Sequence, residues 1–157
     1  MNNIISLKKV SKSFFNNKTL TVLKKIDYSF ARGKIYSLMG PSGSGKSTLL
    51  NILSMIDKPT SGSLLIGDDK IDFNHNIKND EIRPNKIGII YQQNNLLPDF
   101  TALENVYLAG LAFSDDKKSS ITKAKMIIQE MGLSSRENHF PAELSGGEMQ
   151  RVAIARA

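Results

Sequence analysis

The chain has 157 residues, of which 40% are hydrophobic and 23% are charged, a composition typical of one ordinary globular domain. It contains no cysteine, which excludes disulfide bonds, thiolate metal sites and a cysteine nucleophile, and fits a reducing compartment. The first ten residues hold too short an apolar stretch for a signal peptide, and no run reaches the ~18 apolar residues of a membrane span. A membrane role is therefore expected to come through a partner protein.

The net charge of +6 is unevenly distributed along the chain. Residues 1–34 carry eight basic side chains against Asp27 alone, so residues 35–157 together are slightly acidic. Such a basic excess could attract nucleic acid, an anionic lipid leaflet or a polyphosphate. Because no aromatic residues alternate with these lysines, as they do on nucleic-acid platforms, we favour a solvated strand face and expect no nucleic-acid partner.

The first predicted elements in chain order are strands. Residues 26–30 alternate apolar and polar side chains, as in a half-buried strand, and we expect them to pair antiparallel with residues 4–10 across a turn at 15–19. The apolar run 35–39, bounded by glycines, predicts a short buried strand. Residues 49–53 repeat apolar side chains at helical spacing, so the order is strand, glycine-rich loop, helix.

Beyond this helix, residues 61–70 predict a small hairpin and residues 86–92 a second buried strand. The pattern then becomes helical, since Thr101 and Glu104 form a capping box and a further helix stops at Gly132. That further helix has one apolar face, made of Ile121, Ala124, Ile127, Ile128 and Met131. A last helix starts at Gly146 and meets no stop signal before the printed sequence ends.

The glycine-rich loop "GPSGSGKS", Gly40–Ser47, matches the pattern G-x-x-x-x-G-K-[ST] in full, between a predicted strand and a predicted helix. Its glycines let successive backbone N–H groups surround a phosphate, and the start of the helix adds partial positive charge. The Lys46 ammonium would reach the β- and γ-phosphates, and the Ser47 hydroxyl would bind magnesium. The alternative is a glycine turn with a chance lysine. We expect the loop to bind a nucleoside triphosphate through Gly40, Pro41, Ser42, Gly43, Ser44, Gly45, Lys46, Ser47 and Thr48.

A second motif, "LSGGEMQR", covers residues 144–151. Ser145 and Glu148 form a capping box that predicts a helix start. Gly146 and Gly147 each cost up to ~1 kcal/mol of helix propensity relative to alanine, which a plain helix start does not explain. A phosphate group approaching the bare helix end does explain them.

With both motifs in this order, the sequence from Leu7 to Ala157 resembles the ATPases of ATP-binding-cassette (ABC) transporters. The stretches "IYQQNNLLPDFTALENV" and "ELSGGEMQRVAIARA" are most similar to the branch that releases lipoproteins from the inner membrane. The macrolide-exporter and cell-division branches remain alternatives, and Glu148 in place of the commoner glutamine is usual in this group.

The resemblance implies an α/β fold, a P-loop NTPase of the ABC type. It combines a mixed sheet, an N-terminal antiparallel β region and a helical insertion, and here lacks the C-terminal strands. Residues 1–94 would form the nucleotide-binding core with the antiparallel β region, residues 95–143 the helical subdomain, and residues 144–157 the signature motif and the start of its helix.

The resemblance also implies roles for individual residues, with ATP and Mg²⁺ as cofactors. Phe14 would stack on adenine, although Phe15 could serve instead and a strand-end core aromatic is the plain alternative. Gln92 would join Lys46 as a catalytic residue and Ser47 as a magnesium contact; the alternative is an ordinary polar residue at a strand end. Leu144, Ser145, Gly146, Gly147 and Glu148 would close over the nucleotide of a second subunit in a head-to-tail dimer. Integral membrane subunits would hold this dimer at the cytoplasmic face of the inner membrane.

Hydrolysis needs a carboxylate that holds the metal and a group that orients water, which the family carries after the signature motif as an apolar-Asp-Glu segment and a histidine. The lookalike "LLIGDD", residues 64–69, is interpreted as a hairpin turn, and His75 and His139 as surface residues in loops. We therefore expect the 157 residues to bind ATP without useful hydrolysis and to be part of a longer ATPase.

Two other classes of function are alternatives to a transport ATPase. A soluble ABC ATPase of DNA repair or chromosome structure usually has long insertions between its motifs, whereas Leu144 follows Thr48 by only 96 positions, with no heptads or cysteines. A non-catalytic remnant that binds ATP is the other alternative.

Overall fold

The computed structural model describes residues 3–73, 82–112 and 116–157. It divides into two compact units, Met1–Ile87 and Gly88–Ala157. His75, which the sequence places in a surface loop, lies outside the described residues.

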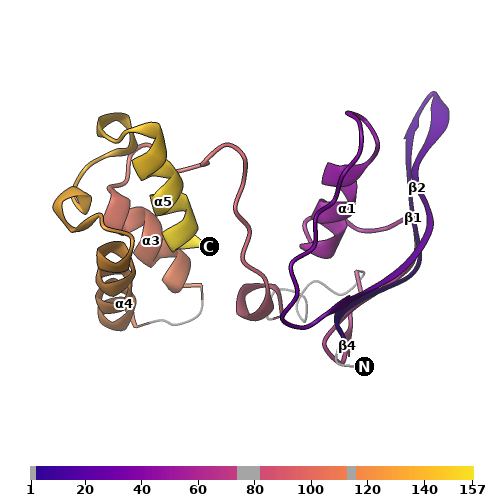
Figure 1. Cartoon of the computed structure of the whole chain (residues 1–157), viewed down its shortest axis with the longest axis horizontal. Coiled ribbons are helices and arrows are strands. Elements are labelled where there is room, and N and C mark those ends of the chain that lie inside the picture. Colours follow the sequence, from indigo (N-terminus) through magenta and orange to yellow (C-terminus); the bar gives the residue numbers. More distant parts are fainter. Residues whose placement is uncertain (1–2, 74–81, 113–115) are drawn as a thin grey trace. The chain divides into compact units, whose positions relative to one another are not determined.

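The first unit is built on an antiparallel sheet of four strands, β1 (Asn3–Asn16), β2 (Lys18–Ala31), β3 (Ser61–Ile66) and β4 (Asp69–Lys70), in the spatial order β2-β1-β3-β4. β1 and β2 form a long bent hairpin (Figure 1) that turns at Asn17, whose φ is 57°. The predicted antiparallel pairing is confirmed, with Ile5 opposite Phe30 and Val10 opposite Ile26. The hairpin interpretation of residues 61–70 is also confirmed, because β3 turns into β4 at Gly67 and Asp68.

Two successive β-bulges explain where the lysines of β1 and β2 lie. The pairing shifts by one residue on β1 between Leu7 and Val10, and then by one on β2 between Leu23 and Ile26. An extra residue at a bulge lets both flanking side chains point to the same face. Lys8, Lys9, Lys24 and Lys25 are consequently all exposed, and no ion pair joins them to any side chain in the described ranges.

The bulge on β1 requires a glycine on the neighbouring strand. Lys9 adopts a positive φ of 49°, and Gly62 of β3, with φ 92°, lies against it. A Cβ on Gly62 would be 2.4 Å from the Lys9 carbonyl oxygen and 2.6 Å from the Val10 Cα atom. Only glycine fits this close approach between two backbones.

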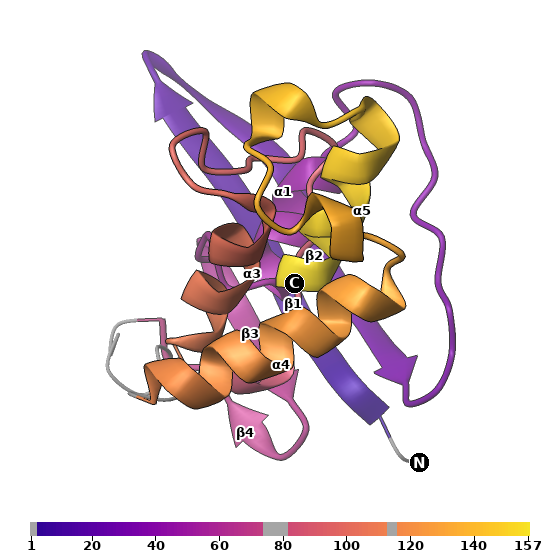
Figure 2. The same cartoon turned by 90° about the vertical axis from the view of Figure 1, so that its left-hand side faces the viewer.

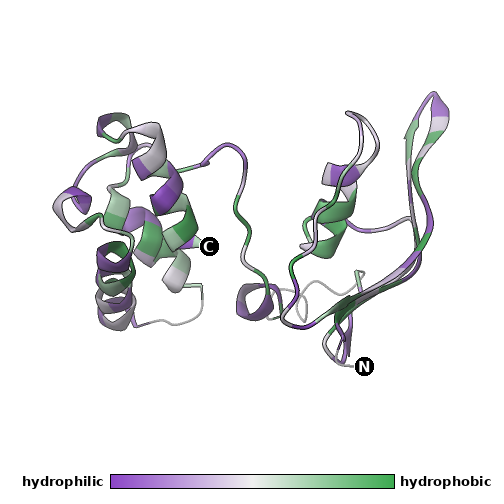
Figure 3. Cartoon of the chain, viewed as in Figure 1, coloured by the Kyte–Doolittle hydropathy of each residue, from purple (hydrophilic) through white to green (hydrophobic). Residues whose placement is uncertain are grey.

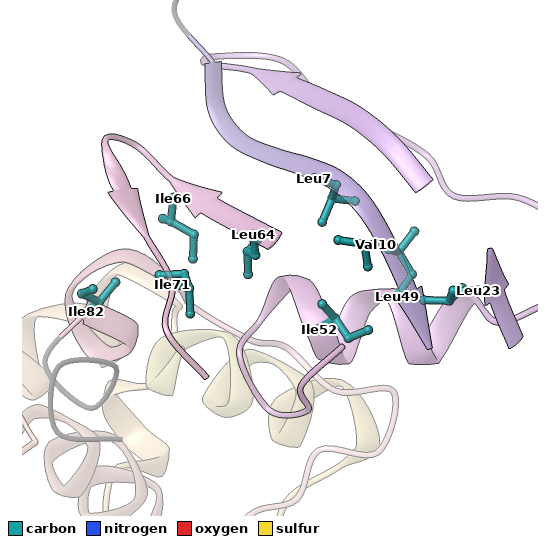
Figure 4. Close-up of a cluster of buried hydrophobic side chains, with 9 residues drawn as sticks. All are labelled: Leu7, Val10, Leu23, Leu49, Ile52, Leu64, Ile66, Ile71 and Ile82. Carbon is teal, nitrogen blue, oxygen red and sulfur yellow. The ribbon is translucent and has the colours of Figure 1, made fainter. Parts of the chain in front are cut away.

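The glycine-rich loop is followed, as predicted, by a helix, α1 (Lys46–Leu53). Leu49 and Ile52 are buried, and Leu50 on the other face is 54% exposed. Figure 4 shows the two buried side chains of α1 pointing toward those of β1 and β2. The cluster consists of Leu7, Val10, Leu23, Leu49, Ile52, Leu64, Ile66, Ile71 and Ile82. Burial of these side chains fixes the start of α1 against the sheet, at about 1.5–3 kcal/mol for each fully buried one.

The two buried strands predicted at 35–39 and 86–92 are wrong. Neither range contains a strand; residues 82–86 are helical, and Ile35 and Met39 are 99% and 87% exposed. The apolar run 35–39 forms the hydrophobic stretch of chain between β2 and α1 (Figure 3). Strand geometry needs a hydrogen-bonding neighbour, and no described segment pairs with either range.

The second unit is helical, with α3 (Ala102–Gly110), α4 (Lys117–Glu130), α5 (Gly146–Arg156) and the short 3₁₀ turns η1 (Ser134–Arg136) and η2 (Pro141–Glu143). The three α-helices pack against one another (Figure 2). Both predicted capping boxes are confirmed, at Thr101 and at Ser145, and α4 ends before Gly132, whose φ is 68°. The buried side chains at the centre are Ala102, Val106, Ala124, Ile128, Leu133, Leu144, Val152 and Ala155.

The helix α5, which begins with the signature motif, thus shares its core with the other helices of the second unit. The division into residues 95–143 and 144–157 stays a prediction.

Asn105 of α3 is 1% exposed and fixes the chain before the helix. Its amide nitrogen donates to the carbonyls of Leu97, Phe100 and Thr101, and its oxygen accepts from the Leu97 N–H. No helix in the described part of the chain is long and apolar enough to cross a membrane.

Gly62→Ala should destabilise the protein by roughly 2–4 kcal/mol, because the added methyl group collides with backbone that has no room to move. Gly33→Ala is the matched control, since Gly33 has a φ of 71° and no atom within 4 Å of an added Cβ. It should cost only the conformational strain, about 1–2 kcal/mol. Urea denaturation would measure both, and equal losses would show that the backbone contact at Gly62 is unimportant.

Candidate functional site

The loop Gly40–Ser47 adopts a backbone that depends on its glycines. Gly43 and Gly45 have φ angles of 78° and 90°, in the left-handed region. The Ser44 N–H donates to the Pro41 carbonyl at 3.3 Å, which closes a turn inside the loop. The loop as a whole is exposed, with Gly45 and Lys46 partly buried at its end.

Gly45 is the point at which the loop meets the sheet. A Cβ on this residue would lie 2.9 Å from Val22 Cγ1 and 3.0 Å from Leu23 Cδ2. The absence of a side chain therefore allows the first turn of α1 to lie directly on β2. Glycine is needed at position 45 for two reasons: its φ is positive, and the close packing leaves no room for a side chain.

The Lys46 side chain folds back over its own loop. Its ammonium donates to the Gly40 carbonyl at 2.8 Å and to the Pro41 carbonyl at 2.7 Å. An ammonium has three donors, so one remains after these two bonds. Both acceptors are neutral carbonyls. No acidic side chain of the described residues forms an ion pair with Lys46.

The start of α1 differs from the starts of the other α-helices whose caps are described. Thr101, Asp116 and Ser145 each cap a helix with a side-chain oxygen, whereas Gly45 at the start of α1 provides no side-chain cap. The first intrahelical hydrogen bond of α1 is that of the Leu49 N–H to the Gly45 carbonyl. The preceding N–H groups are left to bind an outside acceptor, and helix starts of this kind bind phosphate.

The residues expected to bind a magnesium ion fit that role in part. Ser47 lies in the first turn of α1 with an exposed side chain, and its hydroxyl has no hydrogen bond to any other described residue. A free hydroxyl next to a phosphate-binding loop is a suitable magnesium ligand. Gln92, the other expected contact, is exposed and lies outside any helix or strand in the second unit, and its role stays a prediction.

The signature segment Leu144–Glu148 forms the start of α5 and carries a dense set of hydrogen bonds. Leu144 is buried, and the Ser145 hydroxyl accepts from the Glu148 N–H at 3.3 Å. The Glu148 Oε2 atom accepts from the Ser145 N–H at 2.8 Å and from its hydroxyl at 2.7 Å. The Arg136 Nε atom donates to Glu148 Oε1 at 3.0 Å. The contact of Arg136 could not be predicted from the sequence, because no spacing rule relates a residue in a 3₁₀ turn to a glutamate 12 positions away in the first turn of a helix.

These contacts lower the pKa of Glu148 to about 2. The largest causes are the hydrogen bonds from the backbone and the side chain of Ser145, followed by that from Arg136. Each of them stabilises the ionised carboxylate. The start of α5 therefore carries a negative charge at all physiological pH values, in ion-pair contact with Arg136.

The two glycines of the signature segment face open space. An added Cβ on Gly146 would meet no atom within 4 Å, and one on Gly147 would meet only Arg151 Nη1, at 3.8 Å. Packing within the second unit therefore does not require these glycines, although they weaken the helix. An external group that comes close to the backbone remains the explanation for both.

Phe14 lies on β1 near the hairpin turn and is 44% exposed, outside both hydrophobic clusters. The Lys12 ammonium lies 5.0 Å from the centre of its ring. Phe15 is 82% exposed, so both aromatic rings considered for adenine stacking are accessible. The other histidine, His139, is half-buried, and its Nε2 atom lies 3.3 Å from Arg136 Nη1.

Comparison with known proteins agrees with this arrangement of motifs. The chain belongs to the ABC transporter family, which matches it over residues 23–157. It is an ATP-binding domain of the ABC type. The dimeric ATP-binding cassette MJ0796, solved in a post-hydrolysis state bound to ADP and Pi, matches with a TM-score of 0.85 and 40% identity, over 97% of this chain and 68% of that one. The predicted fold class, an α/β P-loop NTPase of the ABC ATPase type, is confirmed.

Similar sequences indicate which branch of the family this chain resembles. The lipoprotein-releasing system ATP-binding protein LolD of Rickettsia bellii is 44% identical over 157 residues, which cover 99% of this chain and 69% of that protein. LolD of Porphyromonas gingivalis is 44% identical over 154 residues, with 98% and 69% coverage. The predicted resemblance to the lipoprotein-releasing branch is confirmed at the level of sequence, and the chain spans about two thirds of the length of these relatives.

The carboxyl group of Glu148 should titrate with a midpoint near 2 when followed by NMR, far below its ordinary value of 4.5. Because the folded-state pKa is the lower one, the contribution of this carboxylate to stability is present above about pH 4.5 and is lost as the pH falls toward 2. Ser145→Ala should move the midpoint upward, and Ser135→Ala, a nearby serine outside the capping box, should not. An unshifted midpoint in Ser145→Ala would contradict the assignment of the hydroxyl bond.

Proposed function

We propose that this chain binds ATP with Mg²⁺ as the nucleotide-binding subunit of an ABC transporter that releases lipoproteins from the inner membrane. The observation that carries the proposal is the uncapped start of α1, preceded by a complete phosphate-loop sequence and covered by an unneutralised ammonium. Family membership supports the nucleotide, and the similarity to LolD proteins supports the cargo.

The free N–H groups of the loop and of the first turn of α1 would bind the phosphate oxygens. The Lys46 ammonium already lies over the loop, held by two carbonyls, and its third donor would bind the β- and γ-phosphates. When bound, Mg²⁺ would supply a bridge between phosphate oxygens and neutralise their charge. The Ser47 hydroxyl and the Gln92 side chain would hold it, and Phe14 would stack on the adenine ring.

The signature segment would act on the nucleotide of a second subunit, so that two subunits enclose two ATP molecules head to tail. Leu144 and Ser145 would position the helix start, and the bare backbone at Gly146 and Gly147 would approach the γ-phosphate. The related cassette bound to ADP and Pi is dimeric, which supports this arrangement. Binding of ATP would close the pair, and hydrolysis would separate it.

Hydrolysis would couple this cycle to integral membrane subunits at the cytoplasmic face of the inner membrane. Gln92 would contact the magnesium ion and the attacking water and signal the nucleotide state to those subunits. We infer that the 157 residues alone bind ATP without useful turnover, because phosphoryl transfer needs a carboxylate that holds the metal, and none of the residues proposed for the site, Lys46, Ser47 and Gln92, carries one. Phosphate release by the 157-residue chain would contradict this inference.

Macrolide export and cell division are the alternative transport functions. Lipoprotein release is favoured by the stretches 90–106 and 143–157 and by the similarity to LolD proteins. Purification of the protein from its own membranes, followed by identification of the integral subunits that accompany it, separates them. Subunits that handle lipoproteins would support the proposal. Drug-efflux or division-site subunits would replace the cargo and leave ATP binding intact.

Lys46→Ala in the protein purified from its own cells should weaken ATP binding at least about 100-fold, because a charge-assisted contact to two phosphates is lost. Lys24→Ala is the matched control, since it removes the same charge from an exposed position on β2. Binding of a fluorescent ATP analogue would measure both. Equal affinity in Lys46→Ala and the unchanged protein would refute the phosphate-loop assignment.

A further inference from the structure

The inference rests on the proposed function and concerns Arg136, which lies in η1, outside both sequence motifs. The Arg136 Nε atom donates to Glu148 Oε1 at 3.0 Å. Its Nη1 atom lies 3.3 Å from His139 Nε2. Because a guanidinium can only donate, Arg136 is the donor in this contact. Arg136 is thus oriented on one side by His139 and bound on the other to the signature helix.

The two oxygens of Glu148 have different partners. Oε1 accepts from Arg136, and Oε2 accepts from the N–H and the hydroxyl of Ser145. The carboxylate therefore connects η1 to the residue that begins the signature helix. If Arg136 were absent, Oε1 would keep no partner among the described residues.

The charge of Glu148 creates a problem for the proposed function. A carboxylate in the first turn stabilises a helix. It also repels a polyphosphate that approaches the same helix end, and like charges brought together at an interface are costly. The Arg136 guanidinium is in direct contact with this carboxylate and places a positive charge beside it, which offsets the repulsion.

The hydroxyl of Ser145 adds a second requirement. Its single proton is donated to Glu148 Oε2. To bind a phosphate oxygen the hydroxyl must turn away, and Glu148 then loses one of its donors. The bond from Arg136 to Oε1 is independent of that rotation and keeps the carboxylate in place.

We propose that Arg136 is a positioning residue for the signature segment, which acts through Glu148. It neutralises and anchors this carboxylate, so that Ser145, Gly146 and Gly147 can receive the γ-phosphate of the nucleotide on the partner subunit. Arg136 itself does not touch the nucleotide.

The test compares four forms of the protein purified from its own cells with its accompanying subunits: unchanged, Arg136→Gln, Glu148→Gln and the double variant Arg136→Gln/Glu148→Gln. In Arg136→Gln the carboxylate is uncompensated, so KM for ATP and the ATP concentration needed for subunit association should rise about tenfold. In the double variant the charge is balanced again, so both values should fall back well below those of Arg136→Gln, to within about threefold of those of Glu148→Gln.

If the ion pair were purely structural, all three variants would lose the same contact. KM in the double variant would then be as high as in Arg136→Gln. That outcome, or an unchanged KM in Arg136→Gln, overturns the proposal. Thermal unfolding of each variant identifies loss of folding. If Arg136→Gln does not fold, Arg136→Lys takes its place. This variant keeps the charge, so its KM must stay near normal. A tenfold rise in the KM of Arg136→Lys also overturns the proposal. Lys46→Ala in the same assay separates failure of the Arg136 proposal from failure of the proposed function. If the proposed function is correct, this variant must lose ATP binding whether or not Arg136 has the role proposed for it.

Discussion

The whole site depends on the start of α1, where backbone N–H groups are left without a partner among the residues that the structure describes. Leaving such groups unsatisfied in a buried position would be costly, and here they lie at the surface beside an ammonium. Gly45 makes this possible, because its lack of a side chain lets the helix begin directly on β2. The buried contacts of Leu49 and Ile52 with the sheet then hold the helix start rigidly. The geometry of the loop thus depends on the sheet on which α1 packs.

Features that depend on neighbours in sequence could be predicted, whereas those that depend on distant partners mostly could not; the pairing of β1 with β2 is the exception, because a short turn joins the two strands. The capping boxes at Thr101 and Ser145 are formed by residues three positions apart, so the chain itself brings the groups together. The strand predicted at 35–39 failed for the opposite reason. Its apolar composition is that of a buried strand, but ladder hydrogen bonds come from another segment, and none of the described segments supplies them.

The bulges on β1 and β2 show an intermediate case. The sequence gives two pairs of adjacent lysines between apolar residues, a pattern that breaks the alternation expected of a strand. Only the structure shows that each break is absorbed by one extra residue, and that Gly62 on the third strand is required by the first of them. The roles of Gln92, Phe14 and the signature residues are predictions that rest on the resemblance to the ABC family, whereas no role could be predicted for Arg136, because its contact with Glu148 arises from the packing of η1 beside α5.

The starts of α1 and α5 have opposite electrostatic properties. At α1 the N–H groups are uncapped and a lysine supplies positive charge, so the start alone can hold an anion. At α5 a serine and an ionised glutamate already cap the helix, which stabilises the helix but places negative charge where an anion is proposed to approach. The second start can therefore serve a phosphate only if the glutamate is paired with a cation and if backbone near it is bare. Arg136 supplies the first condition and Gly146 and Gly147 supply the second. A helix start that is stable before the nucleotide arrives, and still open to it, needs both features together.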